Sequence, residues 1–323
     1  NARFPRVMHS EGLTNRWRRS SLGLWTTEFA SISQKSAVLG EKRTKVRLQR
    51  SAGRLLRPAG NSTGKRKRPP KTRMSRLYIA WSSSETCDVT FRDWDWDARP
   101  VRFLVSFVYL KEWREWCTRR NPVVRSTMLD SGAYSAWKSG YEIDIDELSD
   151  ESINGGWDEA VGLDVIGDWE GSRKNAQHMA SRGSNAFPVF HFGEPWSLLQ
   201  EYCERYDKVG ISCRFGEPVT ASTAWVENCF AKFWPHKFHS FGWVGNDILR
   251  RVPFHSADTA SWQVPVIWGR WTSFGGMRHG GRGGQWNVQS EVEMYLKLER
   301  ELESRWKKTL NTLEKSPTHL SVK

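Results

Sequence analysis

Eight short apolar runs recur along the chain after residue 74, and segments with helical spacing of apolar positions separate most of them. Strands that alternate with helices are typical of a parallel sheet. A count of eight favours an α/β fold of the (β/α)8 or TIM-barrel type over an open doubly wound sheet. The predicted strands are residues 77–81, 102–110, a run that ends at 128–130, 160–166, 187–192, 208–212, 237–243 and 253–257.

Helical patterns are predicted between these strands, at residues 111–118, 145–153, 173–181, 196–205, 223–233 and 246–251. After the eighth strand, the Gly-rich basic residues 274–286 predict a loop. Residues 290–310 predict one charged helix, and the polar tail after Asn311 is expected to fray. The predicted domains are a catalytic barrel over residues 74–272, followed by the Gly-rich loop, helix and tail over residues 273–323.

Charge divides the chain into a basic leader and a nearly neutral body. Residues 1–73 hold 19 of the 49 Lys and Arg residues but three of the 36 Asp and Glu residues, and they lack sustained apolar periodicity. We expect a disordered leader there. Three interpretations of it stay open: a dispensable segment that is not native to the protein, a basic arm that contacts nucleic-acid phosphates, and an organelle transit peptide.

The cysteines indicate a reducing compartment. Five are scattered along the chain and no two have Cys-x-x-Cys spacing, so we expect reduced thiols rather than a disulfide framework or a Cys-rich zinc site. No apolar run approaches the length of a membrane span, and the start lacks the apolar region of a secretory signal. We therefore expect a cytoplasmic protein that does not act at a membrane.

Polar side chains stand where several predicted strands end, which is the reactive face of a parallel barrel. Residues 128–137 read MLDSGAYSAW, so the third strand delivers Asp130 to the barrel mouth, and Ser131 and Gly132 let a ligand approach closely. Residues 255–262, HSADTASW, have the same layout around Asp258. The polar or small residues at strand ends are Asp130, Asp164, His191, Ser212, Gly242 and Asp258.

Three of these residues are carboxylates, Asp130, Asp164 and Asp258, and we expect them to face one pocket. Like charges repel in a desolvated site, and no Lys or Arg ends a strand to pair with them. Each alone is also compatible with a helix cap or a loop-ordering aspartate. Three at equivalent strand ends favour a functional site.

A metal site is an alternative use of the same residues, with His191 and Glu194 as further ligands. No His-x-His pair follows the first strand, as it does in many metal-dependent barrel hydrolases, and we predict neither a metal nor a cofactor. His239 and His255 are interpreted as histidines of the core or rim.

The Gly-rich residues 275–284 have two interpretations. In the first, their backbone N–H groups bind a phosphate with help from Arg278 and Arg282, and in the second the segment is a flexible surface loop. Neither a Walker nor a Rossmann spacing is present, so the sequence does not decide between the two.

A family resemblance links these segments in order. Residues 130–134, Asp-Ser-Gly-Ala-Tyr, resemble the Asp-Ser-Gly-Gly-Phe segment of tRNA-guanine transglycosylases, which are (β/α)8 barrels. Residues 162–164 (Gly-Leu-Asp) resemble the segment of that family's base-recognising aspartate. Residues 241–249 are similar to its Gly-Val-Gly-x-Pro-x-Asp-Ile/Leu segment. Residues 256–258 (Ser-Ala-Asp) resemble the segment of its nucleophilic aspartate.

The chain most resembles the diverged transglycosylase-like proteins of phages and bacteria, which are associated with 7-deazaguanine modification of DNA. The resemblance covers residues 74–262. The tRNA enzymes carry a Cys-x-Cys-x-x-Cys zinc site that this chain lacks, which favours DNA over tRNA as the substrate. His191 stands near the family's Gln, and residues 210–212 (Gly-Ile-Ser) replace its double Gly, so base recognition is expected to differ.

The resemblance implies a base exchange in a nucleic acid. Asp258 would attack C1′ of a guanosine nucleotide, and Asp130 would be the general acid and then the base. Asp164 would bind the N–H edge of the purine, and Tyr134 or Trp262 would stack on it. The substrate contacts implied in this way are Asp164, Ser131, Gly132, Tyr134, His191, Ser212, Gly242 and Trp262.

The implied partners are DNA or tRNA and a free 7-deazaguanine base, and the target base must leave the helical stack. Since the body offers little positive charge, the leader, Arg270, Arg278 and Arg282, or a partner protein that delivers DNA, would have to bind phosphates. Two other functions stay open: a carboxylate-dependent hydrolase of nucleosides or glycosides, and a non-catalytic barrel that binds a nucleotide.

Overall fold

The computed structural model of the protein describes residues 75–213, 219–242, 247–263, 270–273, 276–279 and 289–315. The side chains are described for residues 75–213, 220–242, 247–263 and 289–308. The predicted leader, residues 1–73, lies outside the described residues.

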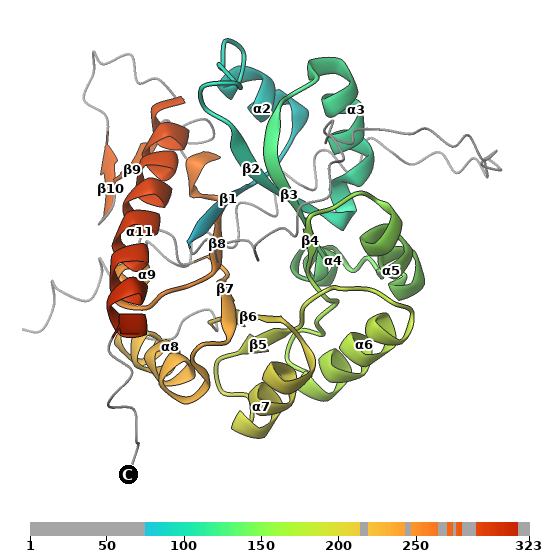
Figure 1. The fold of residues 1–323 in the computed structure, drawn as a ribbon. Coiled ribbons are helices and arrows are strands. Elements are labelled where there is room, and N and C mark those ends of the chain that lie inside the picture. The colour runs from blue at the N-terminus through green and yellow to red at the C-terminus, as the bar shows by residue number, and fades with distance from the viewer. Residues whose placement is uncertain are drawn as a thin grey trace, which may run out of the picture. The chain divides into compact units, whose positions relative to one another are not determined.

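Eight parallel strands form a ring that is surrounded by helices, seen nearly end-on in Figure 1. The order of the strands in the sheet is β4-β3-β2-β1-β8-β7-β6-β5, which is the cyclic order of a (β/α)8 barrel opened between β4 and β5. A parallel bridge between Val161 and Phe187 spans that opening. The fold class predicted from the eight apolar runs is confirmed. The strands are β1 Arg76–Ala80, β2 Val101–Ser106, β3 Val124–Asp130, β4 Glu159–Ala160, β5 Val189–His191, β6 Lys208–Ser212, β7 Lys237–Ser240 and β8 Ser256–Thr259.

Helices follow the strands around the outside of the ring (Figure 1). Three of them begin at a side-chain cap: Ser83 accepts a hydrogen bond from the amide of Thr86, and Asp144 and Asp168 cap α5 and α6 in the same way. The helices are α2 Ser84–Thr90, α3 Leu110–Arg120, α4 Ala133–Ser139, α5 Ile145–Asn154, α6 Trp169–Ser181, α7 Trp196–Arg205, α8 Val219–Phe233, α9 Ile248–Arg251 and α11 Gln289–Lys315, with 3-10 turns η2 Phe107–Tyr109 and η3 Ser261–Gln263.

Alternation along the strands separates two apolar layers. Leu77 and Ile79 of β1 point outward into a large core shared with the helices, where Trp113 and Trp116 of α3 stack at 5.6 Å between ring centroids. Tyr78 between them points into the barrel. The smaller inner cluster is drawn from the strands and the residues that flank them: Tyr78, Leu104, Met128, Val161, Phe187 and Val189.

Below this inner cluster, toward the amino ends of the strands, the barrel interior is charged. Glu159 accepts hydrogen bonds from Lys208 Nζ at 2.5 Å, Arg76 Nη1 at 3.1 Å and Tyr78 Oη at 3.4 Å. Lys208 is 6% exposed, so this ion pair is shielded from water. The partners satisfy the carboxylate that enters with β4.

Helix α11 covers the same part of the barrel beside β1. Its Glu299 is 4% exposed and accepts hydrogen bonds from the amide of Leu77 at 2.9 Å and from Arg125 Nη1 at 2.8 Å. Arg102 Nε lies 3.3 Å from the same carboxylate. One buried glutamate thereby joins the C-terminal helix to the first three strands.

Several predicted boundaries were wrong. The predicted fourth strand, 160–166, pairs only over Glu159–Ala160, and β2 ends at Ser106, where a 3-10 turn replaces the predicted end of that strand. The eighth strand was predicted at 253–257 but runs over Ser256–Thr259, so Asp258 lies within it rather than after it. Helices α2 and α4 were not predicted.

The segment after the barrel also differs from the prediction. Strands β9 Arg270–Ser273 and β10 Gly276–His279 pair antiparallel, so the first part of the predicted Gly-rich loop is a hairpin. Helix α11 is longer than predicted and continues through Lys315. Its residues Val292, Tyr295, Leu302 and Trp306 are buried, and Leu296 is partly buried.

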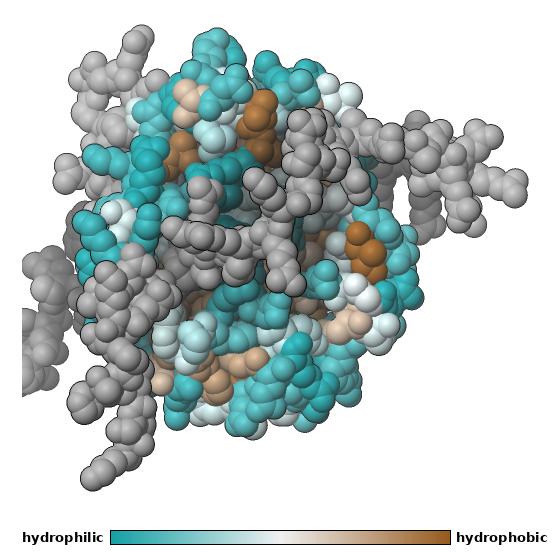
Figure 2. Space-filling view, in the orientation of Figure 1, coloured by the Kyte–Doolittle hydropathy of each residue, from teal (hydrophilic) through white to brown (hydrophobic). Residues whose placement is uncertain are grey.

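The described surface is mainly hydrophilic, and Figure 2 shows hydrophobic residues of this face only in small separate patches. No described helix has the length and apolar content needed to cross a membrane. Cys87, Cys117, Cys203 and Cys229 are free thiols, so the predicted lack of a disulfide framework is confirmed among the described residues.

Candidate active site

Asp130 ends β3 and is held by the turn that follows it. The amide of Gly132 donates to Asp130 Oδ2 at 3.0 Å, and Gly132 has φ of +77° as it begins α4. A Cβ at this position would lie 2.8 Å from Ser106 Oγ. Glycine is therefore required here twice, by the left-handed backbone and by the space beside β2.

Asp258 is placed in a similar way by β8 and by the loop after β7. The amide of Gly242, with φ of +70°, lies 3.3 Å from Asp258 Oδ1 and donates to it. His239 Nε2 lies 3.4 Å from the same oxygen. The side chain of Asp258 is 13% exposed, so the carboxylate is largely shielded but can be reached.

Both aspartates hold their protons far more tightly than an ordinary aspartate. Burial raises the pKa of Asp130 to about 7, and the charges of Asp164 and Asp258 add to the shift against the hydrogen bond from Gly132. Burial likewise raises the pKa of Asp258 to about 7. The charges of Asp164 and Asp258 thus both act on the carboxyl group of Asp130.

Asp164 has a cationic partner that sequence reasoning missed. His191 Nε2 lies 3.2 Å from Asp164 Oδ2, and His191 Nδ1 lies 3.2 Å from Glu194 Oε1. Burial disfavours the charged imidazole, yet the hydrogen bonds to both carboxylates prevail and raise the pKa of His191 to about 9. At neutral pH an imidazolium thus lies between two carboxylates. The search for Lys or Arg at strand ends overlooked histidine as a cation.

The turn after β4 positions Asp164. Pairing of β4 with β3 ends at Ala160, and Val161 forms a single bridge with Phe187. The chain is then fixed from the side of α6: the amide of Leu163 donates to Met179 Sδ at 3.4 Å, and that of Val165 donates to Ser172 Oγ at 2.8 Å. Asp164 lies between these two anchors and is 12% exposed.

The other predicted substrate contacts have separate outcomes. Ser131 is 2% exposed and its hydroxyl accepts from the amide of Ala133, while Ser212 pairs in register with His191. The ring of Tyr134 is half-buried at the start of α4, with the Lys138 ammonium 5.0 Å from its centroid. These positions agree with a place at the mouth.

Trp262 does not fit the predicted stacking role. It is fully buried, its ring lies 5.8 Å from that of Phe91, and its Nε1 donates to the carbonyl of Ala80 at 2.9 Å. It is a core residue because the turn after β8 directs it inward between β1 and the outer helices. His239 and His255 are buried, as predicted for core histidines.

The predicted phosphate contacts are only partly within the described residues. Arg270 and Arg278 belong to the β9–β10 hairpin, where their side chains are not described, and Arg282 lies outside the described residues. Across the described part of the chain, no three His, Cys, Asp or Glu side chains are grouped as metal ligands.

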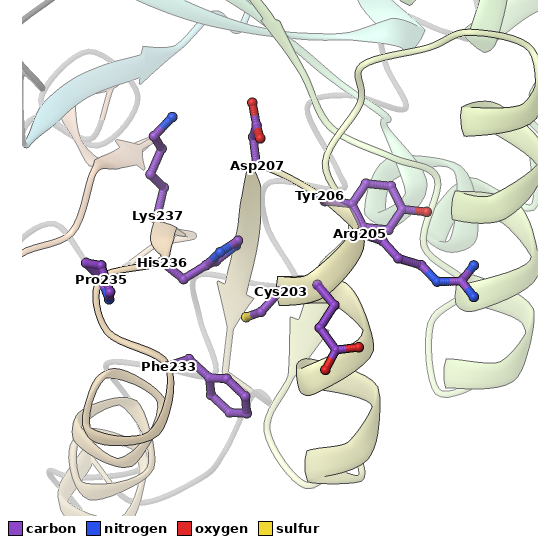
Figure 3. A pocket seen from close by; sticks show the side chains of 9 residues that line it. Cys203, Arg205, Tyr206, Asp207, Phe233, Pro235, His236 and Lys237 are labelled. Atoms are coloured by element: carbon purple, nitrogen blue, oxygen red, sulfur yellow. The ribbon is translucent and has the colours of Figure 1, made fainter.

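A pocket lies at the end of the barrel opposite to Asp130 and Asp258. An open pocket of about 540 Å³ is formed where α7 and α8 end and where β6 and β7 begin (Figure 3). Cys203, Asp207, His236 and Lys237 are among its lining residues. It contains none of the predicted site residues, so it does not bear on their chemistry.

Comparison with known proteins leaves the family open. No protein-family model matches the chain, and no curated protein matches it. Among solved structures, the chain is similar to a putative fructose-1,6-biphosphate aldolase from Coccidioides immitis, at 11% sequence identity and a TM-score of 0.38. That match covers 75% of this chain and 90% of the other. A likeness of this strength carries no information on substrate or reaction.

Proposed function

We propose that the protein is a base-exchange glycosyltransferase that replaces guanine in a nucleic acid, with DNA favoured over tRNA, by a 7-deazaguanine derivative. The observation that carries the proposal is the pair Asp130 and Asp258, two shielded carboxyl groups near the carboxyl ends of β3 and β8 that each have a pKa of about 7. Near neutral pH such a pair commonly holds a single proton, so one member is an acid while the other is a nucleophile.

In the first half-reaction the proton passes from Asp130 to the leaving base, and in the second a proton returns to Asp130 from the incoming base. An Asp258 oxygen attacks C1′, the bond from C1′ to the guanine nitrogen breaks with its electron pair, and Asp130 gives its proton to the leaving guanine. The incoming base then gives a proton to Asp130 and attacks C1′, which breaks the bond to Asp258. The proton inventory is unchanged after one exchange.

Asp258 is assigned the attack because of its surroundings. Asp130 faces two negative charges, Asp164 and Asp258, which favour its protonated form. Asp258 instead faces the Gly242 amide and His239, which are compatible with a carboxylate. The resemblance of residues 256–258 to the nucleophile segment of tRNA-guanine transglycosylases supports the same assignment.

Recognition of the base is assigned to the carboxylate of Asp164. Its contact with the charged His191 orients the Asp164 side chain, whose oxygens can accept hydrogen bonds from the N–H edge of a purine. Tyr134 is the aromatic residue placed to stack on that base.

The test is exchange of labelled guanine, measured with guanine-containing DNA and with tRNA. We expect Asp258→Asn to lower exchange by about 10³-fold or more and to abolish a covalent complex that survives denaturation. Asp150→Asn, at a carboxylate of α5 that is 63% exposed, is the matched control and should exchange at the wild-type rate.

Other outcomes would reject base exchange. An abasic product without guanine incorporation would indicate a hydrolase, and nucleotide binding without turnover would indicate a recognition barrel. Wild-type exchange by Asp258→Asn would exclude Asp258 as the nucleophile.

A further inference from the structure

A line of buried polar groups crosses the barrel interior from the charged layer to Asp258. Lys208 Nζ, which binds Glu159, also lies 3.5 Å from Ser256 Oγ. Ser256 Oγ lies 2.8 Å from His239 Nδ1, and His239 Nε2 lies 3.4 Å from Asp258 Oδ1. Ser256 and His239 are each 0% exposed. The β7–β8 register, which pairs His239 with Ser256, brings these groups together.

The donors and acceptors along this line fix its direction. The ammonium of Lys208 can only donate, so the oxygen of Ser256 accepts from it, and the one Ser256 proton can be donated to His239 Nδ1. The opposite tautomer, with the proton on Nδ1, would set the Nε2 lone pair against the Asp258 oxygen. Burial and the nearby Lys208 charge lower the pKa of His239 well below its ordinary value, so the imidazole is neutral and carries one proton. With Nδ1 accepting, that proton is on Nε2, toward Asp258.

The position of the imidazole is fixed by its neighbours. Rings of Phe241, Phe187 and Tyr78 lie 4.5, 5.7 and 6.5 Å from the His239 ring between centroids. Its Nε2 makes no hydrogen bond to another described residue, and Asp258 is the acceptor it faces. A buried donor without a partner is costly, so a shift of a few tenths of an ångström toward Asp258 would be favourable.

We propose that His239 is a positioning residue for Asp258: held as its Nε2–H tautomer by Ser256 and Lys208, it donates to the Asp258 carboxylate and orients it for attack. This rests on the proposed role of Asp258 as nucleophile. His239 of β7 and the amide of Gly242, just after β7, then supply one donor each. The titratable groups that face His239 are Asp258, Lys208, Glu159 and Tyr78.

The test measures the ionisation of Asp258 directly, without a substrate. Carboxyl carbons of aspartate are labelled with ¹³C in the full-length protein, and the Asp258 signal is assigned by its loss in Asp258→Asn. We expect His239→Leu to raise the Asp258 pKa by about one unit, a tenfold loss of carboxylate at a fixed acidic pH. In His239→Gln, which keeps an N–H donor in reach, the Asp258 pKa should return most of the way to its wild-type value.

Exchange kinetics supply the second readout. In His239→Leu the acidic limb of the kcat/KM profile should move to higher pH with the Asp258 signal, and KM should change little. An unchanged Asp258 pKa in His239→Leu, or no rescue by His239→Gln, would overturn the proposal. If His239→Leu does not fold, Ser256→Ala decides, because it removes the donor that fixes the tautomer; an Asp258 pKa equal to wild type then overturns it.

The two proposals can fail separately. A shifted Asp258 pKa in a protein that exchanges no guanine in DNA or tRNA would support the positioning role and reject the proposed function. Wild-type exchange with an unshifted Asp258 pKa would reject the positioning role and leave the proposed function standing.

Discussion

Glu159 and Asp258 lie at opposite ends of the barrel interior, and their side chains are almost equally exposed, at 15% and 13%. Burial raises the pKa of both carboxyl groups, but their partners differ. Lys208 and Arg76 outweigh burial at Glu159 and lower its pKa, whereas the pKa of Asp258 rises to about 7.

The contrast separates a structural end of the barrel from a chemical one. At the amino ends of the strands each buried carboxylate has two cationic partners, as Glu299 has in Arg102 and Arg125. At the carboxyl ends, Asp130 and Asp258 each accept a hydrogen bond from a glycine amide. A shielded carboxyl group without a cationic partner destabilises the fold when it ionises. Its raised pKa also makes it reactive near neutral pH.

Removal of the Glu159 carboxylate is expected to have the largest effect on stability. Glu159→Ala leaves Lys208 buried without its counter-ion, and such a loss costs roughly 3–5 kcal/mol of unfolding free energy. Urea unfolding measures it. The double variant Glu159→Met/Lys208→Met removes both charges and should recover most of the loss. A loss below about 1 kcal/mol in Glu159→Ala would show that water reaches Lys208 and that the two ends do not differ as described.

The fold was predictable where local pattern and tertiary burial agree. The predicted ranges 196–205 and 208–212 match α7 and β6 because polar residues bound each apolar pattern on both sides. The predicted strand 160–166 failed for the opposite reason. Of its apolar residues, Ala160 and Val161 pair in the sheet whereas Leu163 contacts α6, and an apolar sequence pattern does not distinguish such a contact from strand pairing.

The site was predictable as a set of strand ends but not as a set of contacts. Asp130, Asp164 and Asp258 could be found because a parallel barrel gathers the carboxyl ends of its strands. The partners His239 and His191 depend on register and on the turn after β4. His239 meets Ser256 only because β7 and β8 pair in that register, and sequence periodicity holds no information on pairing between strands.

The pH dependence of stability is expected to differ between the two ends. Asp130 and Asp258 have folded-state pKa values of about 7, well above the ordinary 3.8. Between about pH 4 and 7 the folded protein binds more protons than the unfolded chain, so unfolding free energy falls as pH rises through this window. Glu159, with a lowered pKa, contributes stability that is lost as pH falls below its ordinary range near 4.5.

In the variant Asp130→Asn/Asp258→Asn, the unfolding free energy should no longer fall as pH rises between about 4 and 7. Its stability relative to wild type should rise from pH 4 to pH 8 by roughly 4 kcal/mol for each of the two carboxyl groups, measured by urea unfolding at each pH. Asp150→Asn, whose carboxylate is exposed, should keep the wild-type slope. A double variant with the wild-type slope would show that the two aspartates ionise as freely in the folded protein as in the unfolded chain.

An ion pair with good geometry but little burial should give the smallest effect. Arg250 binds Glu301 of α11 through two hydrogen bonds, Nε to Oε1 at 2.7 Å and Nη2 to Oε2 at 3.1 Å. The side chains are 29% and 50% exposed, so solvent screens the attraction and hydrates whichever partner is left behind. Arg250→Gln should therefore cost less than about 1 kcal/mol, and the loss should shrink in high salt.

Glu301→Gln should cost no more than Arg250→Gln, which also loses the 3.6 Å contact of Arg250 with Asp247, and the double variant should cost little more than Arg250→Gln. The comparison with Glu159→Ala is the decisive one, since both experiments break an ion pair of similar length. A loss in Arg250→Gln as large as that in Glu159→Ala would mean that geometry, and not shielding from water, sets the strength of these pairs. The distinction between the two ends of the barrel would then have to rest on hydrogen-bond number alone.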